Sequence, residues 1–305
     1  MGGSRSMFRA AAGAAAVALV ASAGGFAVAT DRCEAITHFN VIALRDFHQT
    51  ASEVLGPLAV GGNARLNSFA INPAGKCGRD GRVPDEIALV VAGDLRAHNG
   101  QINNGKVLVG GRRAIRDDVG LRCARVVSIK EDLSFDGLES WVTESHEELC
   151  DTREDNCRTR VDDARGITLT IRDGGPATCV VKARDLGRAS RLAIVGRRRD
   201  HRVIIKVDGD DRDDDGEALT LTNFGLDGFV PTHTVMAFCD VRKLIIDNVG
   251  IPSAVFAPKT ALSGPAGHIL GTTVVESFRG GVEFQHAPYD CNQEDRAEPS
   301  PEARD

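Results

Sequence analysis

The sequence predicts a mainly β fold, a β-solenoid of the right-handed β-helix type, with one accompanying α-helix at residues 133–149. Two observations support this prediction. Short apolar runs end three times in a small, tight corner, at residues 61–62, 92–94 and 110–111. The corners at Gly93 and Gly111 lie 18 residues apart, and the same interval separates Ala257 from Val275. A constant interval between strand corners is typical of a chain that winds in coils.

The first 29 residues have the composition of a signal peptide. Arg5 and Arg9 precede an apolar run at residues 10–21, and residues 27–29 (Ala-Val-Ala) fit the small-residue cleavage pattern. The apolar run is shorter than the roughly 20 residues that span a bilayer. We therefore predict cleavage after Ala29, a secreted or cell-surface location, and no membrane span after cleavage. The alternative is an uncleaved anchor.

Residues 30–291 are predicted to form one large β domain, and residues 292–305 a disordered acidic tail. The 33 Gly and 11 Pro suit a turn-rich chain, and aromatic residues make up only 5% of it, so the core is expected to be mainly aliphatic. The net charge of −6 argues against a dedicated nucleic-acid binder, because such domains are usually basic.

The predicted helix rests on the spacing of Phe135, Leu138, Val142 and Leu149, with Trp141 beside this apolar stripe. We interpret the stripe as core packing against the β body rather than a ligand groove. Residues 72–86 and 151–165 are expected to be loops. Apolar runs predict strands at residues 39–43, 58–60, 87–95, 107–109, 166–171, 178–183, 191–196, 201–207, 218–221, 234–240, 243–249, 254–258 and 272–278.

All eight cysteines follow the predicted cleavage site, and an even count in an exported chain indicates disulfides. Cys150 and Cys157 are the best local pair, and Cys33 and Cys291 lie at the two ends of the domain, where a bond would clamp it. Sequence alone does not choose among the possible pairings. The candidates are Cys33, Cys77, Cys123, Cys150, Cys157, Cys179, Cys239 and Cys291.

A metal site has little support in the sequence. Asp211, Asp213 and Asp215, followed by Gly216, match the start of an EF-hand calcium loop, but its twelfth position is Thr222 instead of the bidentate Glu. We favour a solvated acidic loop, with calcium as the alternative. No CxxC or HExxH motif indicates zinc. We therefore expect no cofactor.

Other catalytic or binding motifs are also missing. The glycine pairs lack the Gly-Lys-Ser/Thr of a P-loop, so we interpret them as strand corners. No GxSxG elbow surrounds a serine. The basic clusters at residues 112–113 and 197–199 have no aromatic neighbours for base stacking, although an acidic polysaccharide could use them. Thr-Leu-Thr occurs at residues 168–170 and 220–222 without the regular threonine ladder that ice binding needs.

The ordered set of motifs resembles the choice-of-anchor A domain family of secreted and surface proteins, which is similar to ice-binding-like adhesive domains. The resemblance covers residues 36–288 and rests on FNVIALRDF (39–47), LAVGGNARL (58–66), LVVAGDL (89–95), NGQINNGKVLVGG (99–111), DNVGIPSAVFAPKTAL (247–262) and GHILGTTVVESFRGGVEFQH (267–286). It implies an adhesin-like module with a β-solenoid body and a helix alongside. It supplies no catalytic residues.

The sequence therefore favours a secreted, non-enzymatic adhesion or extracellular-matrix module that binds a glycan or a matrix protein through one face. One alternative is a carbohydrate-active enzyme on a β-helix scaffold, for which a cleft lined by carboxylates would be needed. Another is a purely structural wall protein without a soluble partner.

Overall fold

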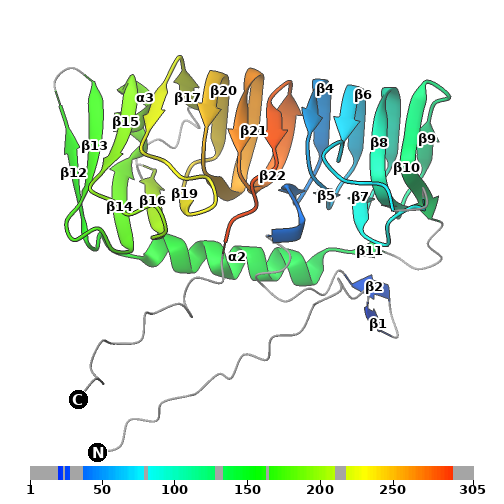
Figure 1. Cartoon of the computed structure of the whole chain (residues 1–305), viewed down its shortest axis with the longest axis horizontal. Coiled ribbons are helices and arrows are strands. Elements are labelled where there is room, and N and C mark those ends of the chain that lie inside the picture. Colours follow the sequence, from blue (N-terminus) through cyan, green and yellow to red (C-terminus); the bar gives the residue numbers. More distant parts are fainter. Residues whose placement is uncertain are drawn as a thin grey trace, which may run out of the picture.

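The computed structural model describes residues 20–22, 25–27, 37–78, 82–127, 133–162, 165–209 and 218–290 (Figure 1). This part of the protein is mainly β, as predicted, and contains two helices. Most strand pairs are parallel, and the main sheet winds helically, with further strands attached to it. Residues 41–43, 58–60 and 87–91 are continuous apolar strands buried on both sides, a pattern that is typical of parallel pairing.

The strands that precede the long helix form one half of the stack: β3 (Val41–Ala43), β4 (Phe47–Val54), β5 (Leu58–Val60), β6 (Ala64–Ile71), β7 (Ile87–Val91), β8 (Leu95–Val109), β9 (Arg113–Ile115) and β10 (Val119–Val127). The other half follows the helix: β12 (Cys157–Val161), β13 (Gly166–Ile171), β14 (Ala177–Lys182), β15 (Arg191–Val195), β16 (Val203–Asp208), β17 (Leu219–Thr222), β18 (Gly225–Asp227), β19 (Thr234–Cys239), β20 (Lys243–Ile251), β21 (Ala254–Leu270), β22 (Thr273–Gly280) and β23 (Glu283–Gln285).

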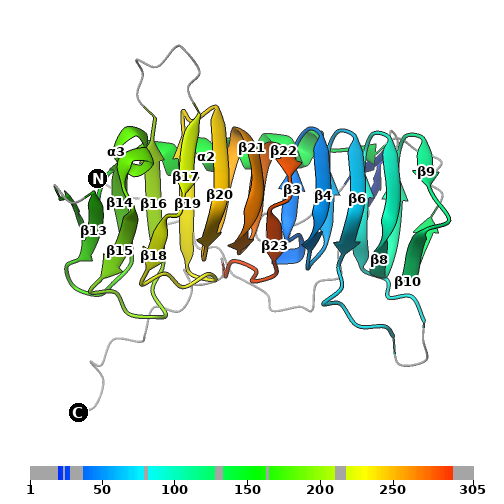
Figure 2. The same cartoon turned by 90° about the horizontal axis from the view of Figure 1, so that it is seen from above.

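The first strand of the main sheet, β3, lies in the middle of the stack rather than at one end. β3 pairs with β5 on one side and with β22 on the other, where Val41 lies opposite Thr273. The coils run from β3 outward to β10. Helix α2 (Asp136–Asp151) then passes along the stack to its opposite end, and the second half winds back to the middle (Figure 1, Figure 2). The two halves therefore meet at a seam between β22 and the strands β3 and β4.

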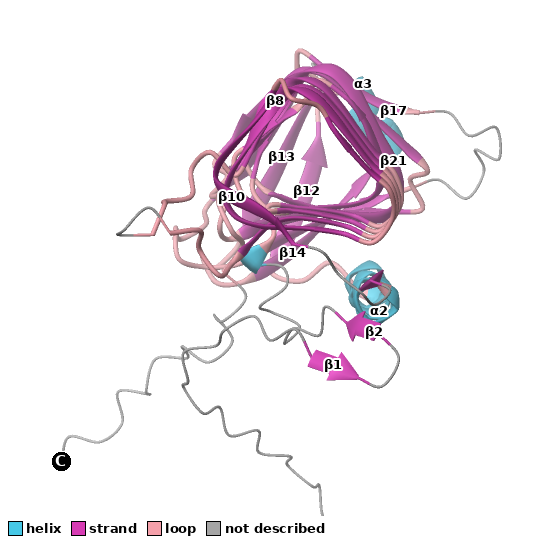
Figure 3. Ribbon diagram, turned by 90° about the vertical axis from the view of Figure 1, so that its right-hand side faces the viewer, coloured by secondary structure: helices cyan, strands magenta, loops and turns pink. Residues whose placement is uncertain are grey.

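Viewed along its axis, the stack has a roughly triangular section, with α2 alongside (Figure 3). On the side next to α2, outward residues of the sheet such as Ile42 and Phe256 form one buried apolar cluster with Leu138 and Val142 of the helix. Fully burying side chains of this size contributes about 1.5–3 kcal/mol each. Trp141 packs against the same cluster, so the stripe is core packing, as predicted.

The predicted 18-residue interval corresponds to one coil. Val91 pairs in register with Val109, and Ala257 pairs with Val275. The glycine corners arise from close approach of successive coils. A Cβ at Gly93 would lie 2.7 Å from the carbonyl oxygen of Gly62, and one at Gly110 would lie 2.4 Å from that of Ala92. Neither glycine has the positive φ that would itself require glycine.

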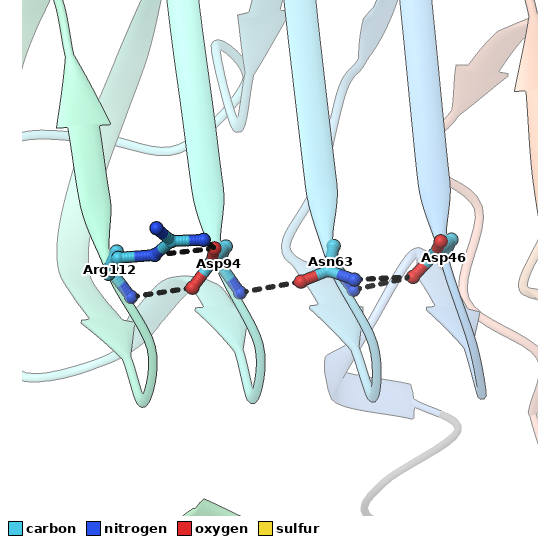
Figure 4. A network of polar contacts seen from close by, with 4 residues as sticks. All are labelled: Asp46, Asn63, Asp94 and Arg112. Carbon is cyan, nitrogen blue, oxygen red and sulfur yellow. Dashed lines mark hydrogen bonds and ion pairs between the residues drawn. The ribbon is translucent and has the colours of Figure 1, made fainter.

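A ladder of hydrogen bonds follows this corner from coil to coil (Figure 4). The backbone N–H of Asn63 donates to Oδ1 of Asp46 at 2.8 Å, and that of Asp94 donates to Oδ1 of Asn63 at 2.9 Å. The backbone N–H of Arg112 donates to Oδ1 of Asp94 at 2.8 Å. Each side chain therefore caps a backbone donor of the next coil, a contribution of about 1 kcal/mol per bond.

Several elements differ from the expectation. The helix begins at Asp136 because Leu133–Ser134 form strand β11. A second helix, α3 (Ala183–Arg188), follows β14 and was not expected. The charged loop predicted at residues 151–165 contains β12, which pairs antiparallel with β13. Only Cys157 of this strand is buried, so backbone pairing with β13, rather than burial of its side chains, makes this charged segment a strand.

Three disulfides join Cys77 to Cys123, Cys150 to Cys239, and Cys157 to Cys179. The expected local pair of Cys150 with Cys157 is therefore wrong. Cys150 lies on α2 and is bonded to β19, which ties the helix to the sheet across 89 residues of sequence. Cys33 and Cys291 lie outside the described residues, so their pairing stays a prediction.

Two short strands, β1 (Val20–Ser22) and β2 (Gly25–Ala27), form a small sheet with β11. The rest of the predicted signal peptide, its cleavage site and the tail at 292–305 lie outside the described residues. In the part of the chain that the structure describes, neither helix combines the length and the apolar character needed to cross a membrane.

Candidate functional site

One side of the stack forms a long sheet that we call the open face, because no long helix of the described chain covers it. Short helix α3 lies only at its end, next to β17. The face consists of β17, residues 243–247 of β20, 261–264 of β21, 277–280 of β22, 47–50 of β4, 64–67 of β6, 95–98 of β8, and β9.

Residues of the open face alternate between the core and the surface, as the period of a strand requires. Phe47, Leu66 and Leu95 are buried below it, whereas Arg65 and Arg96 are exposed above it. Each outward residue consequently has an outward neighbour on the next coil, and similar residues can form rows across the strands.

Four basic residues form such a row at the centre of the face. Arg279 pairs in register with His48, His48 with Arg65, and Arg65 with Arg96. Because neighbouring strands lie roughly 4.8 Å apart, the row extends for about 14 Å. Beside it runs a neutral, hydrogen-bonding row in which Thr50 pairs with Asn67 and Asn67 with His98.

The arginines of this basic row lack carboxylate partners in the described part of the chain. The four strand segments that carry it contain no Asp or Glu. The nearest corner carboxylates are already engaged, since Asp46 accepts hydrogen bonds from Asn63, and Asp94 forms an ion pair with Arg112 at 2.7 Å. The hydrogen bonds from Arg112 hold the pKa of the Asp94 carboxyl below its usual range.

His48 occupies the middle of the row and is half-buried. Burial lowers its pKa, and the positive charges of Arg65 and Arg279 lower it further, while Asp46 acts in the opposite direction. Its Nε2 atom is buried and has no hydrogen-bond partner among the described residues. A buried polar atom without a partner is uncommon in proteins.

Two shallow hollows lie over this region and share His48 and Arg279. One, of about 360 Å³, extends over Arg65 and Arg96. The other, of about 390 Å³, extends toward Lys243. Asp46 is the only carboxylate among the residues lining them, so neither hollow presents the pair of carboxylates that glycoside hydrolysis usually requires.

The open face has no regular threonine grid in the described chain. In the row that contains Arg65, the positions beyond Arg279 are Ser263, Ile245 and Thr220. The threonines of the 220–222 Thr-Leu-Thr segment are exposed at one end of the face, and those of 168–170 lie on β13, in a separate sheet. The described part of the face therefore does not present threonines at the regular spacing that ice binding needs.

The other predicted site residues lie away from the basic row. The calcium candidates Asp211, Asp213 and Asp215 fall outside the described residues. Within the described chain, ligand atoms of His146, Cys150 and Cys239 lie within 4.8 Å of one another. However, both cysteines belong to a disulfide, which leaves no thiolate to bind a metal.

In each of the two basic clusters seen in the sequence, one arginine is engaged in contacts within the protein. Arg112 is paired with Asp94 at the corner. Arg197 is half-buried, donates to Oγ1 of Thr234 at 2.9 Å and to the carbonyl oxygen of His201 at 2.7 Å, and has its pKa lowered by burial.

Sequence reasoning missed the basic row itself. Its residues are separated by unequal intervals along the chain, because residues 72–86 are inserted between two coils and the chain returns to the seam only at β22. A usable signal was present for three of them. His48, Arg65 and Arg96 each stand two positions after a corner residue (Asp46, Asn63 and Asp94), and aligning the coils at the corner superposes them.

Comparison with known protein families gave a match. A family model described as "Putative Ice-binding-like adhesive domain" matches residues 32–286. No match was found among curated proteins or among solved structures. The expected adhesin-like family is thereby confirmed. With the match extending over most of its length, the chain belongs to the ice-binding-like adhesive domain family.

Proposed function

We propose that this protein is a secreted, non-enzymatic adhesion module, built as a β-solenoid, that binds a glycan or an extracellular-matrix protein through the open face. The main support is the open face itself, an exposed parallel sheet with its outward side chains in register across many strands. The sheet surface next to α2 is instead buried against the helix. A rigid, uncovered face is the kind of surface on which a repetitive partner can be bound.

Family membership and the disulfides support the same proposal. The matched family is described as adhesive, and disulfides persist in oxidising, extracellular environments. The hollows over the face present basic and neutral side chains instead of a carboxylate pair, which favours binding over hydrolysis of a polysaccharide.

The test is binding of the purified chain to an array of glycans and matrix proteins. A variant with Thr50→Glu and Asn67→Glu adds two longer, charged side chains to the middle of the open face. A matched control carries Thr168→Glu and Thr170→Glu on β13, outside this face. We expect saturable binding that the first variant weakens and the control retains. Absence of saturable binding, or equal weakening in both variants, would refute the proposed role of the open face.

A further inference from the structure

We propose that the ligand of the open face is an acidic polysaccharide, which lies across β22, β4, β6 and β8 with its carboxylate or sulfate groups on Arg279, Arg65 and Arg96. This inference rests on the proposed function and specifies the chemical class of the ligand.

The charge of the basic row favours an acidic ligand. Arg65, Arg96 and Arg279 are exposed, and in the described part of the chain no carboxylate forms an ion pair with them. The protein as a whole carries a net charge of −6, so this concentration of positive charge is local. Planar guanidinium groups present paired donors that suit the oxygens of carboxylate and similar anions.

The regular spacing of the basic row favours a linear polymer. The row places one basic residue on each of four adjacent strands, in register, over about 14 Å. A linear acidic polysaccharide also carries its charges at regular intervals, on sugar rings whose length is comparable with the distance between strands. A ligand lying along the stack axis could therefore contact successive arginines without bending.

The neutral row beside the basic one favours a sugar polymer. Thr50, Asn67 and His98 offer hydroxyl, amide and imidazole groups at the same strand spacing. Sugars present hydroxyl groups beside their acidic groups, and these can form hydrogen bonds with such a row. His48, between Arg279 and Arg65 in the basic row, lines both hollows.

Other polyanions fit the surface less well. Single-stranded nucleic acids usually bind on exposed aromatic side chains. In these four segments, however, the aromatic residues Phe47 and Phe278 are buried below the sheet. A membrane surface would favour exposed apolar anchors beside the basic residues, and the outward positions here are polar or charged.

The experiment measures binding of the full chain to polygalacturonate, chondroitin sulfate and neutral dextran of similar length, at low and high salt. We expect binding to at least one of the two acidic polymers, weakening with salt, and none to dextran. The variant R65Q/R96Q/R279Q should bind at least about tenfold more weakly, since three exposed charged contacts are lost. The control R158Q/R160Q/R172Q changes the net charge equally, on β12 and at the end of β13, and should stay within about twofold of the unsubstituted chain.

Equal weakening in both variants would overturn the proposal, because binding would then follow net charge alone. Tighter binding to dextran, or binding to neither acidic polymer, would also overturn it. If the array detects a partner whose binding is unchanged in R65Q/R96Q/R279Q but lost in the Thr50→Glu/Asn67→Glu variant, the adhesive function stands and the acidic ligand is wrong. Absence of any partner on the array would refute both.

Discussion

The seam between the two halves of the chain is predicted to depend on three phenylalanines. Phe47 comes from the first half, and Phe278 and Phe284 from the second, and all three are at most 2% exposed. The ring centroid of Phe47 lies 4.9 Å from that of Phe278 and 6.1 Å from that of Phe284. Phe47→Ala should lower the free energy of unfolding by about 3–5 kcal/mol, as expected for truncation of a buried phenylalanine. That is a large part of the roughly 5–15 kcal/mol that stabilises a typical protein.

A double-mutant cycle tests the aromatic contact itself. Phe47→Leu and Phe278→Leu, separately and together, should show a coupling free energy of about 0.5–1.5 kcal/mol. A matched cycle pairs Phe278→Leu with Phe224→Leu, a buried phenylalanine near β17 that is several strands away. It should be additive within about 0.5 kcal/mol.

The assay is urea unfolding followed by far-UV circular dichroism and by the fluorescence of Trp141, the only tryptophan. Trp141 reports docking of α2, whereas circular dichroism reports the whole sheet. We expect both signals to shift together when Phe47 is replaced, because the halves share one core cluster at the seam. An unchanged stability for Phe47→Ala, or an additive Phe47–Phe278 cycle, would contradict this reasoning.

Three further predictions follow from single residues. Asn40 is 1% exposed, donates to the carbonyl oxygens of Gly271 and Gln285, and accepts from the backbone N–H of residue 56. In urea unfolding, Asn40→Ala should therefore lower the free energy of unfolding by about 3 kcal/mol. Asn67→Ala on the surface should lower it by less than about 0.5 kcal/mol. Gly93→Ala should destabilise the protein, because the added Cβ would clash with the backbone of the neighbouring coil. In α2, the Cβ added by Gly137→Ala would meet nothing within 4 Å, so this substitution should stabilise the protein by about 0.5–1 kcal/mol. Thermal midpoints that shift in the same direction for both variants would refute this contrast. Burial lowers the pKa of His146, so the unfolded chain binds more protons at this site and stability should fall as the pH drops below about 6.5. His146→Gln should reduce the dependence of stability on pH, and an unchanged pH profile of unfolding in this variant would contradict the assigned role of His146.

Much of the local structure follows from the sequence alone. Valine- and isoleucine-rich runs predict the buried strands, and the stripe at Leu138 and Val142 predicts α2 and the face that it buries. The glycine corners predict the coil, since an 18-residue interval and small side chains are properties of the local chain. These features depend on periodicity and steric size, and each can be recognised within a few tens of residues.

Only the tertiary structure decided which strands and side chains from distant parts of the chain lie side by side. The seam joins Val41 to Thr273, a contact that no local pattern encodes, because it depends on α2 carrying the chain back along the stack. The same return places Cys150 beside Cys239 rather than Cys157. It also brings Arg279 next to His48 and so completes the basic row. The sequence by itself predicted the most apolar strands, the corners and the long helix, but not β4 or β6, which carry part of the basic row and alternate with polar residues. The candidate site exists only after residues from both ends of the domain have been brought into register.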